Sequence, residues 1–177
     1  MAEGSGIAVL TGPTGVFRMT LPAAGDIPCV KVYRKEKSTA LPKYATAGAA
    51  GADVEAFIPQ KIILQPGQRT KIPTGLVLEI PPGWEAQARP RSGLALKHGI
   101  TVLNTPGTID SDYRGELEII LVNLGTEPYT VHSGDRIAQL VFAHAPQVHL
   151  EAAEELACSE RGEGGFGSTG DNIITAK

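Results

Sequence analysis

Short apolar runs separated by proline and glycine fill the chain from Val30 to about Leu150. These runs are VKVY, KIIL, RTKI, LVLEI, WEAQA, ELEIILVNL, RIAQLVF and QVHL. Each has the length of a β-strand, and the residues between the runs favour turns. The pattern predicts an all-β domain, either a sandwich or a jelly roll.

Two of the runs indicate how their strands are covered. In WEAQA, Trp84, Ala86 and Ala88 alternate with polar residues, which is typical of a strand with one buried face and one wetted face. In ELEIILVNL, residues 119–122 are apolar on both faces. We therefore expect this strand to be covered on both sides, inside the domain or at a subunit interface.

The chain of 177 residues is long enough for one sizeable core with tails. Residues 1–29 are rich in small and turn-forming residues and predict a flexible extension, residues 30–150 form the β domain, and residues 151–177 form a flexible C-terminal arm. The one clear helix is predicted in SGLALKHG, with Ser92 capping its start and Gly99 ending it. A second helical stretch is predicted over residues 151–157.

Composition excludes several classes of partner. The net charge of -3 and the scattered Lys and Arg residues give no basic stripe for a nucleic acid. The longest apolar runs are far below the roughly 20 residues that span a bilayer, which predicts a soluble protein without a membrane partner. Two distant cysteines, Cys29 and Cys158, suggest neither a disulfide framework nor a zinc site. A cytoplasmic location fits best, with a nuclear or organellar one left open.

The segment around Arg91, Ser92 and Gly93 combines a guanidinium, a hydroxyl and backbone N–H groups at the predicted helix start. Helix starts attract anions because their N–H groups lack partners and the helix dipole is positive there. This favours a phosphate-binding loop. The alternative is a simple N-cap beside a surface arginine.

Residues 104–115 form a predicted hairpin that holds two carboxylates beside a tyrosine. An ionised aspartate near a bound phosphate can orient and deprotonate an attacking water, which makes Asp110 a candidate base. The alternative is an ordinary acidic turn. Further along, Gln139 places an amide in an apolar strand, where it needs hydrogen bonds from a substrate or from the neighbouring backbone.

Residues 161–170 place Arg161 and Phe166 in a backbone rich in glycine. A phenylalanine with so little local core is suited to stacking on a base, and Arg, Ser and Thr side chains can bind the phosphates of the same ligand. The alternative is a plain disordered tail.

These segments together resemble the trimeric dUTPases. All five family motifs occur in order, and the resemblance spans residues 31–170. The motifs are AGADV at 50–54, PRSGLAL at 90–96, the hairpin at 104–115, GDRIAQLVF at 134–142, and RGEGGFGSTG at 161–170. Any one of them would be weak, but five in order with coherent spacing are specific.

The resemblance implies a jelly-roll (β-clip) protomer with one short helix. Three protomers would form a homotrimer with shared active sites, each closed by the C-terminal arm of a neighbour. The implied reaction is hydrolysis of dUTP to dUMP and pyrophosphate by attack of water on the α-phosphate, which keeps uracil out of DNA and supplies dUMP for thymidylate synthesis.

The resemblance also assigns site residues. Asp110 would activate the water, Arg91, Ser92 and Gly93 would bind phosphate, and Gln139 would assist near the α-phosphate. Uracil would be read by Asn104 and by backbone groups of Gly107, Thr108, Ile109 and the region of Glu118. Tyr113 would pack under the deoxyribose and exclude a 2'-hydroxyl.

In the arm, the resemblance implies that Phe166 stacks on uracil, next to Gly167, while Arg161, Ser168 and Thr169 hold the γ-phosphate. Mg2+ is expected on the triphosphate oxygens with waters, which suits its reluctance to dehydrate. Asp53 would contact this water shell, or alternatively would brace the Asp110 hairpin.

Three other readings compete. A dCTP deaminase shares the fold and the phosphate handling, but it acts on the base and does not need the glycine-rich arm. A non-catalytic binding module would not need Asp110 or Phe166. A purely structural sandwich leaves the arm unexplained. The intact arm and the hairpin favour the hydrolase.

Overall fold

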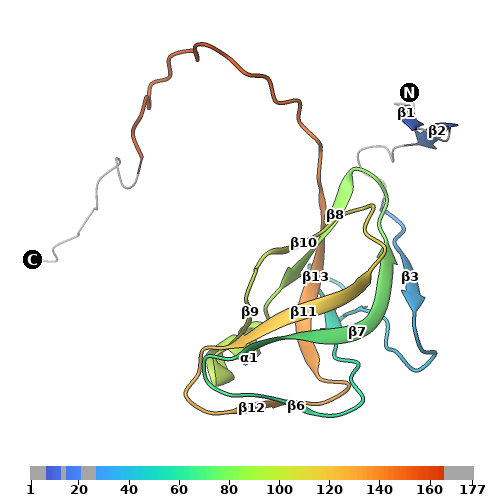
Figure 1. Ribbon diagram of the computed structural model, residues 1–177, viewed down its shortest axis with the longest axis vertical. Coiled ribbons are helices and arrows are strands. Elements are labelled where there is room, and N and C mark those ends of the chain that lie inside the picture. Colours follow the sequence, from blue (N-terminus) through green and yellow to red (C-terminus); the bar gives the residue numbers. More distant parts are fainter. Residues whose placement is uncertain (1–6, 13–14, 21–26, 166–177) are drawn as a thin grey trace, which may run out of the picture. The chain divides into compact units, whose positions relative to one another are not determined.

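The computed structural model describes residues 7–12, 15–20 and 27–165 (Figure 1). Its elements confirm the all-β prediction, since one short helix accompanies the strands. They are β1 (Ile7–Gly12), β2 (Gly15–Thr20), β3 (Lys31–Arg34), β4 (Lys43–Tyr44), β5 (Ala52–Glu55), β6 (Ile62–Leu64), β7 (Arg69–Glu79), β8 (Trp84–Arg89), α1 (Ser92–His98), β9 (Ile100–Val102), β10 (Gly107–Ile109), β11 (Glu116–Asn123), β12 (Tyr129–Val131) and β13 (Arg136–His144).

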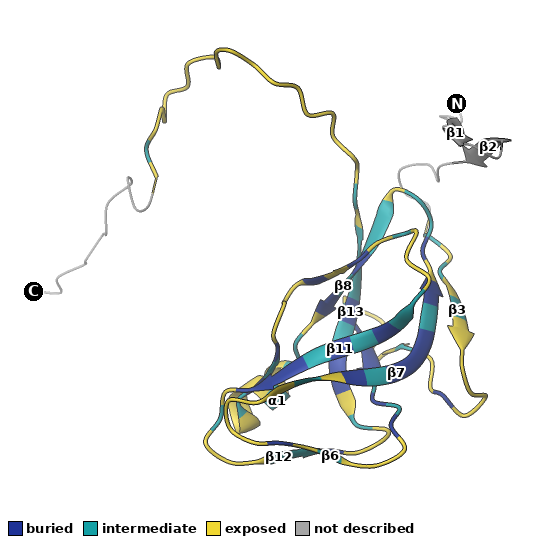
Figure 2. Cartoon of the chain, in the orientation of Figure 1, coloured by how far each residue is buried: buried dark blue, intermediate teal, exposed yellow. Residues whose placement is uncertain are grey.

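Two antiparallel sheets form a jelly-roll sandwich. The five-stranded sheet has the order β10-β8-β13-β5-β4, and the four-stranded sheet has the order β3-β7-β11-β9. Their inner faces share one hydrophobic core, to which Leu140 and Val54 contribute from the first sheet and Ile72, Ile119 and Leu121 from the second. Figure 2 shows this burial along the central strands. Such a two-layer core fits the alternating strands of the sequence.

Strand β8 has the predicted alternation over residues 86–89, whereas Trp84 is only partly buried. Ala86 and Ala88 are buried, whereas Arg89 is exposed. In β11, Ile119, Leu121 and Val122 are buried, while Ile120 between them is only partly covered. The segments RTKI and LVLEI form one strand, β7, and not the two that the sequence suggests.

Helix α1 differs at its start from the prediction. Ser92 is its first helical residue, the extended residue before it is Arg91, and no side chain caps the helix by a hydrogen bond. The prediction of Ser92 as the cap is therefore wrong. The end is confirmed, because Gly99 has φ of 67° and its N–H reaches Ala95 O and Leu94 O.

The two ends of the chain also differ from expectation. Strands β1 and β2 pair antiparallel within a segment for which the sequence predicts no strand. The second unit of the chain begins at Val148, and residues 151–157 form no helix. Leu150 and Leu156 are almost fully exposed, and a short helix without a covered apolar face is not stable in water. Along the described residues, no helix has the length and apolar character needed to cross a membrane.

Candidate active site

A small pocket of about 60 Å3 opens between β10 and β11. Residues of both strands line it, together with Ala88 of β8 and Val102 of β9. Its lining includes five residues that the sequence assigns to base recognition, which are Asn104, Gly107, Thr108, Ile109 and Glu118. We call it the β10–β11 pocket.

Gly107 makes room for the amide of Asn104 at this pocket. A Cβ atom at Gly107 would lie 3.0 Å from Asn104 Nδ2, which is closer than most real contacts. Gly107 is buried, whereas Asn104 is exposed and keeps its amide accessible. Exposed backbone edges beside a side-chain amide can read both donors and acceptors on a planar base.

Tyr113 is tied to the start of β11. Its hydroxyl donates a hydrogen bond to the carbonyl of Glu116 at 3.1 Å, and its N–H donates to Asp110 O at 3.2 Å. The ring lies over Gly115, where a Cβ atom would come within 2.2 Å of the Tyr113 hydroxyl oxygen. The tyrosine position therefore depends on a glycine two residues later.

Asp110 follows directly after β10, so its backbone position is set by the strand that borders the pocket. Its side chain is exposed. Asp110 also borders a wide groove of about 1420 Å3, in which the rings of Trp84 and His144 pack against each other in a tilted pair with centroids 3.9 Å apart. No sequence pattern marks this groove, because β8 and β13 meet there only in the folded chain.

A second set of predicted residues gathers around Asp53, which is only 7% exposed. Its Oδ1 accepts hydrogen bonds from Arg91 Nε and Gln139 Nε2, each at 3.1 Å, and its Oδ2 accepts one from Arg136 Nη1 at 3.1 Å. Gly51 lies under Gln139, since a Cβ there would come within 3.1 Å of Gln139 Cβ. We call these side chains the Asp53 cluster.

The cluster has one carboxylate and two guanidinium groups, so it carries excess positive charge. Buried Asp53 fixes the two arginines, while the side chain of Arg136 is about half exposed. Ser92 and Gly93 lie next in the chain after Arg91, and both are exposed. An array of fixed cations beside exposed N–H groups is suited to phosphate. Arg136 was missed, because GDR reads as an ordinary turn.

At Ala88 and Gly107 the β10–β11 pocket lies on the core face of the five-stranded sheet, whereas Asp53 and Gln139 of the Asp53 cluster lie on the other face. Gln139 pairs with Asp53, while the next residue, Leu140, pairs with Ala88, and Ala88 pairs with Gly107. Paired residues share a face, and successive residues alternate between faces. Ala88 and Gly107 therefore face the pocket and the core, whereas Asp53 and Gln139 point away.

The remaining predicted residues belong to the arm. Arg161 is exposed and donates from Nε to Gly164 O at 2.7 Å, within a turn that also joins Gly162 N to Ser159 O. The other arm residues lie outside the described residues, and they are Phe166, Gly167, Ser168 and Thr169.

The described ranges hold no cluster of three or more His, Cys, Asp or Glu side chains placed to bind a metal ion. Asp53 is the residue that the sequence offers to a hydrated Mg2+. Both of its oxygens already accept hydrogen bonds, so it fits contact through water better than direct ligation. Its contacts are to Arg91, Arg136 and Gln139.

The dUTPase family profile matches residues 37–170. A deoxyuridine 5'-triphosphate nucleotidohydrolase of Treponema denticola is 60% identical over 142 residues, which cover 80% of this chain and 99% of the relative. The protein of the same name from Cytophaga hutchinsonii is 57% identical over 141 residues, with 80% and 91% covered.

Solved structures of dUTPases are similar to this chain. The Staphylococcus bacteriophage 80alpha dUTPase, solved with dUPNHPP, has a TM-score of 0.71 and 28% identity, and the match covers 81% of this chain and 99% of that one. A mutant dUTPase from phage phi11 of S. aureus, which coordinates a structural Mg(II) ion, has a TM-score of 0.65 and 23% identity, with 72% and 97% covered. The second likeness shows the fold alone.

Proposed function

The chain belongs to the dUTPase family and hydrolyses dUTP to dUMP, and we propose that it does so by attack of water on the α-phosphorus, with release of pyrophosphate. The observation that carries the mechanism is the convergence on one small pocket of Asn104, the 107–109 backbone and Glu118, with Asp110 as the next residue. A small recess with polar lining beside an exposed carboxylate suits recognition of the polar edge of a base, with the reactive phosphorus outside the recess.

Base selection belongs to the β10–β11 pocket. The Asn104 amide and the backbone of residues 107–109 would pair with the polar edge of uracil. The amino group of cytosine would place a donor where an acceptor is needed, and the methyl group of thymine would compete for the narrow space. Discrimination by unpaired polar groups and exclusion is stronger than discrimination by apolar contact alone.

Sugar selection belongs to Tyr113. Its ring is held between a hydrogen bond to Glu116 O and the bare Cα of Gly115. A ring in this position, under the deoxyribose, leaves no room for a 2'-hydroxyl. The role is a proposal that agrees with the fixed ring and with its partial exposure.

Asp110 is the proposed base. Its exposed carboxylate can accept a proton from a water that attacks the α-phosphorus in line with the departing pyrophosphate. Arg91, Ser92, Gly93 and Gln139 would hold the phosphates, with Asp53 fixing Arg91 and Gln139 in place. Bound Mg2+ would neutralise charge on the triphosphate oxygens.

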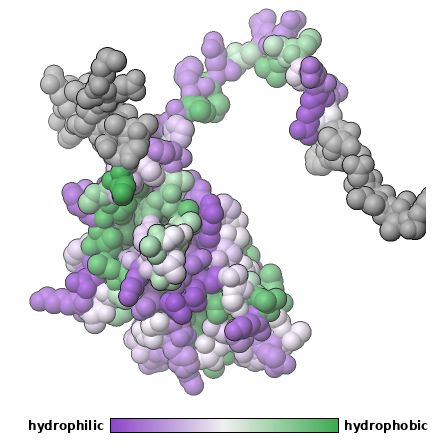
Figure 3. Space-filling view, turned by 180° about the vertical axis from the view of Figure 1, so that it is seen from behind, coloured by the Kyte–Doolittle hydropathy of each residue, from purple (hydrophilic) through white to green (hydrophobic). Residues whose placement is uncertain are grey.

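We further propose a homotrimer with shared sites. The core-facing side of the pocket and the Asp53 cluster lie on different faces of the sheet, which supports a site in which the pocket of one protomer works with the Asp53 cluster of another. The exposed surface supports association, because α1 buries none of its residues and Leu96 on it is 89% exposed. Figure 3 shows apolar patches among the hydrophilic side chains of the β domain. Arg161, Phe166, Gly167, Ser168 and Thr169 of the arm would close the site of a neighbour.

The test is pyrophosphate release from dUTP, dCTP, dTTP and UTP, each with Mg2+ and with a chelator. We expect Mg2+-dependent release from dUTP alone. Asp110→Asn should keep nucleotide binding while lowering kcat by ~100-fold or more, as for loss of a general base. Release of ammonia from dCTP would indicate the deaminase instead, and a wild-type rate in Asp110→Asn would remove Asp110 from the mechanism.

A further inference from the structure

The pairing of β7 with β11 is interrupted beside the β10–β11 pocket. Glu116 lies opposite Val77, and Glu118 lies opposite Pro73, so β7 inserts extra residues where β11 advances by two. Gly75 within this bulge has φ of 69°, a conformation that disfavours side chains. Bulges break the regular ladder, and their free backbone groups need other partners.

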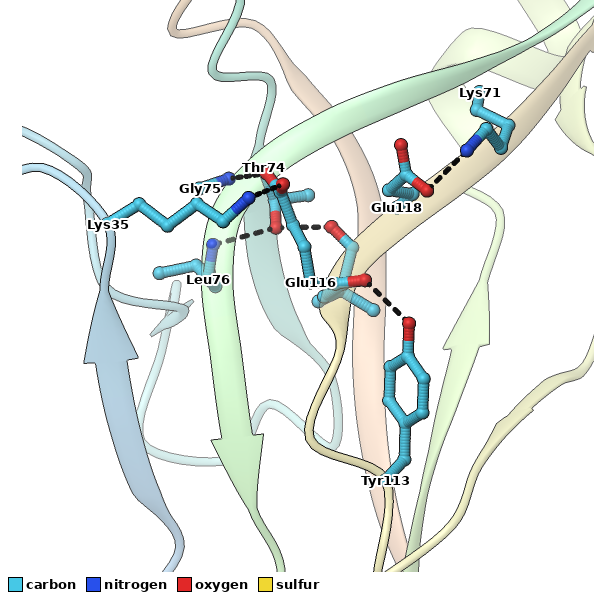
Figure 4. A network of polar contacts seen from close by, with 9 residues as sticks. Lys35, Lys71, Thr74, Gly75, Leu76, Tyr113, Glu116 and Glu118 are labelled. Atoms are coloured by element: carbon cyan, nitrogen blue, oxygen red, sulfur yellow. Dashed lines mark hydrogen bonds and ion pairs between the residues drawn. The ribbon is translucent and has the colours of Figure 1, made fainter.

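Thr74 provides one of these partners from inside the core. It is only 1% exposed, and its hydroxyl donates to Leu117 O at 2.6 Å while it accepts from Leu76 N at 3.3 Å (Figure 4). The hydroxyl thus ties β11 to the bulge at Leu117. A buried polar side chain with both hydrogen-bonding functions satisfied fixes its neighbours in one arrangement.

Glu116 provides the second partner. Its Oε1 accepts a hydrogen bond from Gly75 N at 2.8 Å, and its Oε2 pairs with Lys35 from the loop after β3. Only 18% of the side chain is exposed. The carboxylate therefore replaces the backbone acceptor that the bulge removes from the ladder.

Thr74 and Glu116 both hold backbone next to residues of the proposed site. The backbone carbonyl of Glu116 holds the Tyr113 hydroxyl, as Figure 4 shows, and Leu117 and Glu118 form part of the pocket wall. Because the start of β11 is attached at Glu116 and Leu117, the bulge determines where the tyrosine ring and this wall stand relative to each other.

We propose that Thr74 and Glu116 are positioning residues for substrate selection, which hold the β11 start so that Tyr113 accepts deoxyribose and rejects ribose. This inference rests on the proposed function of the pocket. Neither residue lines the β10–β11 pocket. They act through the carbonyl of Glu116 and the backbone of Leu117.

The test compares Thr74→Val with Thr74→Ser. Valine keeps the shape of the side chain and removes both hydrogen bonds, whereas serine keeps the hydroxyl. Thr70→Val is the matched control, since it makes the same change at a partly buried site of β7 outside the bulge. The readouts are kcat/KM for dUTP and UTP, the affinities for dUMP and UMP by calorimetry, and the Tm.

We expect Thr74→Val to lower the preference for dUTP over UTP by ~10-fold or more, chiefly through a higher kcat/KM for UTP, because a small displacement of the ring that excludes the 2'-hydroxyl changes binding by such factors. Thr74→Ser and Thr70→Val should stay within about 3-fold of the wild type, too little to count as a loss of positioning. Serine loses the methyl group and keeps the hydroxyl, so a normal preference in Thr74→Ser assigns the effect of Thr74→Val to its missing hydrogen bonds and not to packing.

Unchanged sugar preference in folded Thr74→Val, with only a lower Tm, would overturn the inference. If that variant does not fold, Glu116→Ala tests the same link from the edge of the core and should show the same loss. If the wild type does not hydrolyse dUTP, the proposed function fails. The positioning by Thr74 and Glu116 is still tested in that case, by the relative affinities of the variants for dUMP and UMP.

Discussion

Mixing two inactive variants tests whether a site is built from two copies of the chain. Asp110 lies beside the β10–β11 pocket, and Arg91 belongs to the Asp53 cluster on the other face of the sheet. We choose Asp110→Asn and Arg91→Gln. The glutamine can still donate to buried Asp53 but loses the charge and the forked geometry that phosphate needs.

The expected recovery follows from the geometry. If each site takes Asp110 from one protomer and Arg91 from the next, random assembly of equal amounts of the two variants gives both native residues in about a quarter of the sites. If each site is built within one chain, every site lacks one of the two residues and no activity returns.

The assay is Mg2+-dependent pyrophosphate release after the two variants are unfolded together and refolded. Each variant refolded alone measures the background, and wild-type protein treated in the same way measures the recovery of the procedure. Activity that stays at the background while wild-type protein recovers would refute the opposite-face reasoning. Asp110 and Arg91 of one site would then come from the same chain.

Two further predictions use neighbouring residues. Gly115→Ala should lower the preference for dUTP over UTP, because its Cβ would lie 2.2 Å from the Tyr113 hydroxyl. Gly48→Ala is the control, since a Cβ there meets nothing within 4 Å, and it should keep the wild-type preference. The same preference for dUTP over UTP in both variants would contradict this. Burial raises the pKa of Glu116, but hydrogen bonds from Lys35 and Gly75 outweigh it and hold that pKa below 4.5. Ionised Glu116 therefore stabilises the folded state fully above pH 4.5, and this stabilisation is lost as the pH falls through the folded-state pKa. The Tm of Glu116→Gln should fall less steeply below pH 4.5 than the Tm of the wild type. Parallel plots of Tm against pH for the two proteins would argue against the pairing of Glu116 with Lys35 and Gly75.

Much of the fold could be predicted because strand alternation is local. The burial of Ala86 and Ala88 follows from a period of two, and the end of α1 follows from Gly99. The predicted helix over 151–157 was wrong because its composition favours a helix while nothing packs on it. Local propensity does not reveal tertiary partners.

The grouping of site residues needed the resemblance, and the structure then divided them between two faces. Arg136 could not be recognised from sequence, since it meets Asp53 across 83 positions. Thr74 looks like any strand threonine until the register shift against β11 is known. Residues whose role depends on long-range register carry no periodic signal in the sequence.

The order of strands in the two main sheets affects how readily the protein aggregates. Their outermost strands, β10, β4, β3 and β9, have two to four residues, whereas the inner strands β7, β11 and β13 have eight to eleven. Unpaired backbone at a sheet edge is a template for aggregation, and short edges limit it. The longest and most apolar segments are thus kept away from the positions where amyloid-like growth begins, so a variant that frays β10 or β9 would expose β8 or β11 to such growth before it lost the core.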